Sequence, residues 1–152
     1  VVAAVERAGG FVHGYTFSHH PVTAAACLAV LDILEREDLV ERSRRLGEAA
    51  LLRMEVLRRH PHVGDVRGRG LMLGLELVAD KDARRPFPRA EKRAEALAAA
   101  CFEGGLVTYP SAGAATGADG DVVMLAPPFV VTEPQLVEMV DVLDRSLYAL
   151  GL

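Results

Sequence analysis

The sequence has no tryptophan and only two cysteines, and basic residues do not outnumber acidic ones. Cys27 and Cys101 lie far apart and match no metal-binding or redox spacing, which predicts reduced thiols, buried as small hydrophobic residues, in a cytoplasmic protein. The longest apolar stretch, Val22–Leu31, is about half of what a bilayer-spanning helix needs. With 17 Lys and Arg against 21 Asp and Glu, no basic surface for nucleic acid is expected. The sequence therefore predicts neither a membrane anchor nor a nucleic-acid partner.

What is present is typical of a globular protein. The 152 residues are 51% hydrophobic and 25% charged, which is ordinary for about one domain. The chain begins with Val1 rather than Met, and its first ten residues do not resemble a signal or transit peptide. Either processing has removed the start, or this chain is the back part of a longer protein, which is the expectation that the residues below favour.

The first predicted element is a long helix. Pro21 suits the first position of a helix, and apolar residues then recur at helical spacing up to Arg59, without a proline in between. One long or slightly broken helix over residues 21–59 would approach 55 Å, at ~1.5 Å per residue. A helix of this length is typical of a connection between two bodies.

The rest of the chain predicts a small α+β layer with helices on one face of a sheet. Leu71, Leu73, Leu75 and Leu77 alternate with other residues, which is typical of a strand with one buried face. The glycines before this strand indicate a turn or bulge, and Thr132 with Gln135 predicts a capping box before the last helix. The other expected elements are a surface loop (80–88), a helix (89–103), two short strands (106–109 and 122–126) and a Gly/Ala loop between those strands (111–120).

The densest polar cluster, His13–Pro21, lies directly before the long helix. Its hydroxyls and backbone N–H groups at a helix N-terminus suit an anion, above all a phosphate, although a simple helix cap by Ser18 or a histidine fits as well. A metal site from His13, His19 and His20 is disfavoured because no carboxylate or thiolate lies within the loop. A hydrolase serine at position 18 is disfavoured because no G-x-S-x-G turn surrounds it.

Four sequence blocks together resemble the class III (ω-type) pyridoxal-phosphate-dependent aminotransferases. They are HGYTFSHHP at residues 13–21, GDVRGRGLMLGLEL at 64–77, GLV with YP at 105–110, and LAPPF with TE at 125–133. The blocks occur in the family's order and cover nearly the whole chain. The resemblance identifies the chain as the C-terminal portion of such an enzyme.

The resemblance implies a fold, a domain division and a cofactor. The fold class is α/β: a fold-type-I transferase whose α+β small domain follows a long linking helix and has a small mixed or antiparallel sheet covered by helices. Residues 1–20 would be the tail of the large cofactor domain, 21–59 the interdomain helix and 60–152 the small domain. Tyr15 and Thr16 would reach across a homodimer interface to hold the phosphate of pyridoxal 5′-phosphate bound mainly by the other subunit.

Several residues depart from the family pattern. The family's Schiff-base lysine lies upstream, and neither Lys81 nor Lys92 matches it, so this chain is expected to hold no catalytic residue and to be inactive alone. Tyr109 and Met124 stand where members carry an arginine that accepts a substrate carboxylate, and they are expected to shape the substrate end of the pocket. His19 replaces a common glycine.

The implied reaction moves an amino group from an amine or amino acid to a 2-oxo acid. Two alternatives stay open at this point. One is an aminomutase or a decarboxylating aminotransferase of the same family. The other is a non-catalytic α+β binding module.

Overall fold

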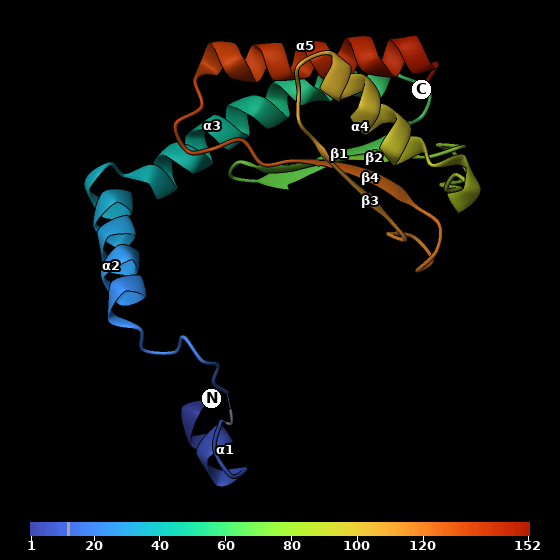
Figure 1. Cartoon of the computed structure of the whole chain (residues 1–152). Coiled ribbons are helices and arrows are strands. Elements are labelled where there is room, and N and C mark those ends of the chain that lie inside the picture. Colours follow the sequence, from blue (N-terminus) through green and yellow to red (C-terminus); the bar gives the residue numbers. More distant parts are fainter. Residues whose placement is uncertain (12) are drawn as a thin grey trace. The chain divides into compact units, whose positions relative to one another are not determined.

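The computed structural model describes residues 1–11 and 13–152, and the chain divides into two units, Val1–Glu37 and Asp38–Leu152. The first unit contains helices α1 (Val2–Arg7) and α2 (Pro21–Arg36), neither of which buries a residue within this chain. The second unit contains the sheet, the remaining helices and all of the hydrophobic core (Figure 1).

The predicted long helix is interrupted once before it ends. Helix α2 stops at Arg36, α3 spans Leu39–Met54, and a 3-10 segment continues over Glu55–Arg59. The break falls at Asp38, whose φ of 48° is left-handed and so cannot continue an α-helix. The helical end near Arg59 is confirmed, and the break marks the boundary between the two units.

The sheet has four antiparallel strands in the order β1-β2-β4-β3. The expected antiparallel sheet and the Leu73/Leu75/Leu77 alternation are confirmed, because these three leucines are buried. The turn or bulge predicted from the glycines before β2 is present, as a bulge near Gly64 and a turn at Gly70, but the prediction missed that this segment is itself a strand. The strand expected at 106–109 was wrong, because the strand lies at 109–112. The strands span Val63–Arg69 (β1), Met72–Leu77 (β2), Tyr109–Ala112 (β3) and Asp121–Leu125 (β4).

Three helices cover one face of this sheet, as the sequence predicted (Figure 1). They are α3, α4 (Arg93–Glu103) and α5 (Glu133–Leu150). The predicted capping box at the start of α5 is confirmed, since Thr132 and Gln135 each satisfy a backbone N–H of the other. The inner sheet residues and the inward helix faces form one core.

Helix α3 crosses the β1–β2 turn at very short range. A Cβ on Gly47 of α3 would lie 2.0 Å from the backbone oxygen of Gly70. Beside this contact, the N–H of Leu71 donates to Oγ of Ser43 at 3.1 Å. The position of the helix over the hairpin therefore depends on the absence of a side chain at Gly47.

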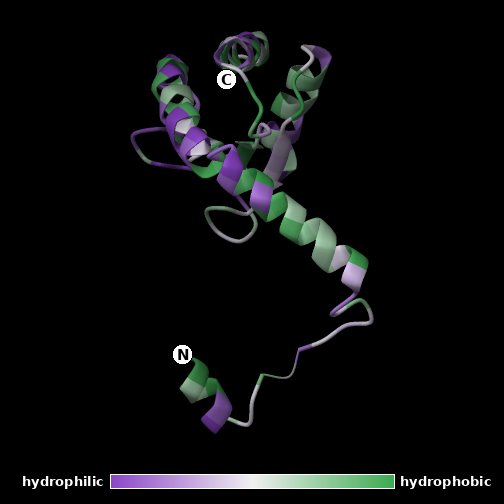
Figure 2. Ribbon diagram, turned by 90° about the vertical axis from the view of Figure 1, so that its left-hand side faces the viewer, coloured by the Kyte–Doolittle hydropathy of each residue, from purple (hydrophilic) through white to green (hydrophobic). Residues whose placement is uncertain are grey.

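Helix α2 is rich in apolar residues (Figure 2). Most of their side chains are exposed in this chain, and none is buried. Cys27 lies on this helix and is exposed, so the prediction that it is buried was wrong, whereas Cys101 on α4 is buried as expected. The difference follows from the packing, because no residue of α2 is buried within the chain. Of the helices described, none has the length and apolar character needed to cross a bilayer.

Candidate functional site

The loop His13–His20 precedes α2 in the first unit and is held by its own short-range hydrogen bonds. The N–H of Tyr15 donates to Oγ of Ser18 at 3.1 Å, and the N–H of Ser18 donates to the carbonyl of Tyr15 at 2.9 Å. The N–H of His20 donates to the carbonyl of Phe17 at 3.1 Å. These bonds fold the segment into a turn whose tip is Thr16 and Phe17.

Thr16 lies at this tip and is exposed. Within the part of the chain that the structure describes, neither its N–H nor its hydroxyl has a partner, whereas the N–H of Tyr15 is already used by Ser18. An exposed amide next to a free hydroxyl is a donor set that suits phosphate oxygens. The loop thus presents an exposed pair of donors at Thr16, with Tyr15 beside it.

The same loop also caps helix α2. Nδ1 of His20 accepts from the N–H of Thr23 at 3.5 Å, so a histidine rather than Ser18 performs the capping role. His19 has a φ of +61°, a left-handed conformation that favours glycine. Among residues 1–11 and 13–152, no three His, Cys, Asp or Glu side chains come together as a metal site would require.

The second candidate region is the face of the sheet that the helices leave open. Cross-strand register aligns Arg67 of β1, Gly74 of β2, Met124 of β4 and Tyr109 of β3 in one row. Residues paired directly across an antiparallel ladder point to the same face. The structure therefore brings together Tyr109 and Met124, the two residues predicted to shape the substrate end, as direct neighbours.

Sequence reasoning missed the other half of this row. Arg67 and Gly74 belong to a block that was interpreted only as a turn followed by a strand. The alternation of Arg67 and Arg69 with Val66 and Gly68 is a period-two signal that could have identified β1. Gly64 and Gly68 obscured that signal, since glycine is depleted in strands.

Arg67 is tied into an ion-pair network on the open face. Its guanidinium forms ion pairs with Glu76 on β2 and with Asp65, the latter at 3.0 Å. Asp65 also accepts from Nη2 of Arg58 at 2.9 Å. Hydrogen bonds to Glu76 and Asp65 raise the pKa of the Arg67 guanidinium. Burial opposes ionisation of Asp65, but the bonds from Arg58 and Arg67 outweigh it and hold the pKa of Asp65 below its ordinary value.

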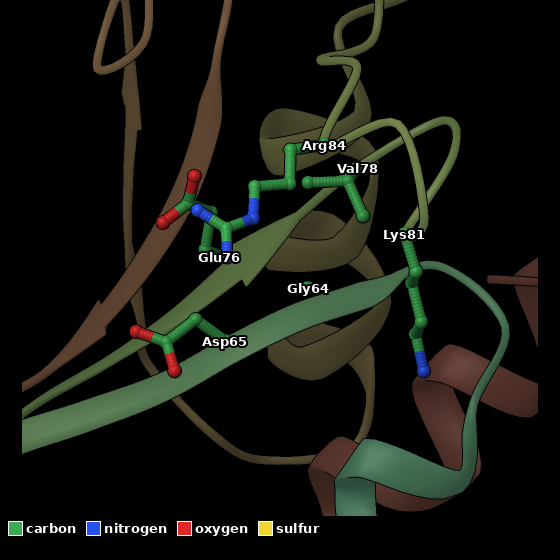
Figure 3. A pocket seen from close by; sticks show the side chains of 6 residues that line it. All are labelled: Gly64, Asp65, Glu76, Val78, Lys81 and Arg84. Atoms are coloured by element: carbon green, nitrogen blue, oxygen red, sulfur yellow. The ribbon is translucent and has the colours of Figure 1, made fainter.

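A polar cavity of about 410 Å³ lies at the edge of this network (Figure 3). Asp65 and Glu76 line it from the two neighbouring strands, and Lys81 and Arg84 line it from the loop after β2. Nζ of Lys81 donates to the carbonyl of Arg58 at 2.7 Å. Because the carboxylates are already paired with arginines, this cavity is typical of a structural ion-pair network.

The two lysines of the chain have structural surroundings of different kinds. Lys81 is held by the Arg58 carbonyl, and Lys92 is an exposed residue with a φ of 50° directly before α4.

Arg42 of α3 holds the segment that follows β4. Its Nε donates to the carbonyl of Phe129 at 2.7 Å, and its Nη2 donates to the carbonyl of Val131 at 2.8 Å. A guanidinium is well suited to bind two acceptors at once because its donors form a rigid fork. The end of the strand that carries Met124 is thereby fixed to the helix layer.

Comparison with known proteins gives a consistent family. A family model described as Aminotransferase class-III matches residues 1–147. An uncharacterized aminotransferase of Schizosaccharomyces pombe is 39% identical over 134 residues, which is 88% of this chain and 29% of the relative. An adenosylmethionine-8-amino-7-oxononanoate aminotransferase of Methanocaldococcus jannaschii is 34% identical, over 89% of this chain and 28% of the relative.

A solved structure supports the same conclusion. An amine transaminase from an uncultivated Pseudomonas species, in its PLP-bound form, superimposes with a TM-score of 0.79 at 34% identity. The match covers 91% of this chain and 30% of that one. The chain thus spans about three-tenths of the length of the curated relatives it matches.

Proposed function

Because the chain belongs to the class-III aminotransferases, we propose that the protein containing it transfers an amino group from an amine or amino acid to a 2-oxo acid. The observation that carries the proposal is the family match over residues 1–147. The exposed donor set at Thr16 and the pairing of Met124 with Tyr109 are compatible with the roles that the family implies.

The cofactor of this reaction would be pyridoxal 5′-phosphate, which supplies a carbonyl carbon and an electron-withdrawing ring to carry the amino group. The N–H and hydroxyl of Thr16 would bind its phosphate, and Tyr15 would position the loop through its bonds to Ser18. This contact would be made to a second subunit of a homodimer. The exposure of the loop in this chain is compatible with such a contact.

Tyr109 and Met124 would line the substrate end of the pocket from the open face of the sheet. Residues 1–20 would belong to the large domain, 21–59 to the connection and 60–152 to the small domain. The lysine that takes part in proton transfer would come from outside this chain, so the chain alone would be inactive.

Substitution of Thr16 in the intact protein tests the cofactor contact. Thr16→Ala removes one hydrogen bond to a charged group, which should weaken cofactor binding by about 10- to 100-fold. Thr16→Ser keeps the hydroxyl and should retain most of the affinity. Titration of the apoenzyme with pyridoxal phosphate measures both, and an unchanged dissociation constant in Thr16→Ala would exclude this role.

Product analysis tests the reaction. With alanine as donor and a 2-oxo acid as acceptor, stoichiometric pyruvate and a new amino acid are expected. Migration of the amino group within one substrate would instead indicate an aminomutase, and release of carbon dioxide would indicate a decarboxylating enzyme. Absence of all three products with cofactor bound would leave a binding module.

A further inference from the structure

The open face of the sheet carries a second cavity, separate from the ion-pair cavity of Figure 3. It measures about 510 Å³, and its lining includes Arg69, Met72, Gly74 and Met124, together with Arg67. A cavity of this size is within the range that small-molecule sites occupy. Its walls combine guanidinium groups with methionine side chains.

The two arginines of this cavity differ in what they are bonded to. Arg67 is neutralised by Asp65 and Glu76. Arg69 is exposed at the end of β1, and within the described residues it forms no ion pair. The guanidinium of Arg67 is therefore already paired with carboxylates, whereas that of Arg69 has no paired carboxylate among the described residues.

The register places Arg69 on the same side of the sheet as Met124. Arg69 pairs with Met72, two residues along the strands from the row of Arg67, Gly74 and Met124. Because side chains alternate with a period of two, both rows point to the open face. An anion bound at Arg69 would therefore share its cavity with Met124, which is proposed to line the substrate end.

Because Gly74 has no side chain, the bottom of the cavity between Arg69 and Met124 (the cavity floor) is not filled. A Cβ at this position would meet its nearest atoms, the carbonyl oxygen of Arg67 and a methyl of Val122, at 3.8 Å. Because these are ordinary contact distances and the φ of Gly74 is not positive, the backbone does not demand glycine here. The empty floor is thus space available to a ligand.

We propose that this cavity binds the carboxylate of the 2-oxo acid or amino acid substrate, with Arg69 as its charge partner and the methionines against its apolar body. The proposal rests on the proposed function, since it names the part of the substrate that this face recognises. A guanidinium binds a carboxylate in a bidentate geometry, as it also binds phosphate, and the carboxylate is the anion that a 2-oxo acid or amino acid carries. Neither Tyr109 nor Met124 offers such a group.

Steady-state kinetics of the intact holoenzyme tests this assignment. Arg69→Gln should raise KM for the 2-oxo acid by about 10- to 100-fold, whereas KM for an amine donor without a carboxylate should not change. Arg69→Lys should recover part of the loss, because it restores the charge without the fork. Arg53→Gln, which removes an exposed arginine from α3 on the covered side of the sheet, should behave as wild type.

A second variant tests the cavity rather than the charge. Gly74→Leu should fill the floor and raise KM for the 2-oxo acid while leaving the folded structure intact. The proposal is overturned if Arg69→Gln and Gly74→Leu both keep the wild-type KM, or if they impair the amine and the 2-oxo acid equally.

A binding measurement on the intact protein without cofactor separates the two proposals. Sodium pyruvate should shift the backbone NMR signals of Arg69, Met72 and Gly74, whereas acetone at the same ionic strength should not. Arg69→Gln should abolish these shifts. If the wild-type protein moves no amino group, the proposed function is wrong, and the titration still decides whether the carboxylate site exists.

Discussion

Replacing Gly47 by alanine should destabilise the chain, although a glycine-to-alanine change inside a helix usually stabilises a protein. Gly47 lies inside α3, where alanine is intrinsically more favourable than glycine by about 1 kcal/mol. Propensity alone therefore predicts a gain in stability. The packing of α3 on the β1–β2 turn predicts the opposite.

The magnitude follows from the contact with Gly70. The added Cβ would begin 2.0 Å from the Gly70 oxygen and must reach at least 3.4 Å for an ordinary contact, a shift of about 1.4 Å. Overpacking of this kind costs about 1–3 kcal/mol. The shift also weakens the bond from Leu71 to Ser43, worth about 0.5–1.5 kcal/mol. After the gain in helix propensity, a net loss of about 1–3 kcal/mol remains.

Urea unfolding followed by circular dichroism at the helical band measures this loss in the 152-residue chain. For a slope of about 2 kcal/mol/M, the midpoint should fall by roughly 0.5–1.5 M. Gly74→Ala is the matched control, because its Cβ would meet its nearest neighbours at 3.8 Å, and its midpoint should not fall. A Gly47→Ala chain as stable as wild type would refute the argument from close packing.

Three further predictions concern the same chain. Arg42→Ala should lower the free energy of unfolding by about 1–3 kcal/mol, because two loop carbonyls lose a charged donor. Urea unfolding measures this loss. If Arg42→Lys restored the wild-type stability, the two simultaneous guanidinium bonds would not be required. The pKa of Asp65 is lower in the folded than in the unfolded chain. Its contribution to folding stability is therefore complete above the pKa of the unfolded state and is lost as the pH falls through the pKa of the folded state. The urea midpoint should therefore decrease as the pH is lowered below about 4. Asp65→Asn should make this decrease with pH smaller, and an unchanged dependence on pH would exclude Asp65 as a cause. Burial raises the pKa of Cys101, whereas Cys27 is exposed, so iodoacetamide at neutral pH should label Cys27 in the native chain and Cys101 only after unfolding, as peptide mass spectrometry would show.

Local patterns predicted most of the elements of the second unit. The leucine alternation in β2, the Thr132 capping box and the helical spacing of α5 each depend on residues close together in sequence. Strand β1 was missed for the same reason. Its formation depends on pairing with β2, because the two glycines within it weaken the local strand signal.

Strand β3 shows a second limit of local reasoning. Val107 is a better strand former than Pro110, Ser111 or Ala112, yet it is 77% exposed and Tyr109–Ala112 pairs with β4. Pro110 is tolerated there because β3 is an edge strand, where a missing N–H breaks no inner ladder. Register with a neighbouring strand, rather than propensity, decided where this strand lies.

The amino-acid sequence by itself determined the family, the order of most elements and the short polar loop at Thr16, because each depends on residues that are neighbours along the chain. Only the tertiary structure decided that Arg67, Gly74, Met124 and Tyr109 share one row. It also decided that Arg69 lines the cavity beside Met124 and has no counter-ion among the described residues. The physical reason is that the register of the hydrogen-bonded strands decides which side chains are neighbours. In the pair β2–β4 this register joins segments more than thirty residues apart.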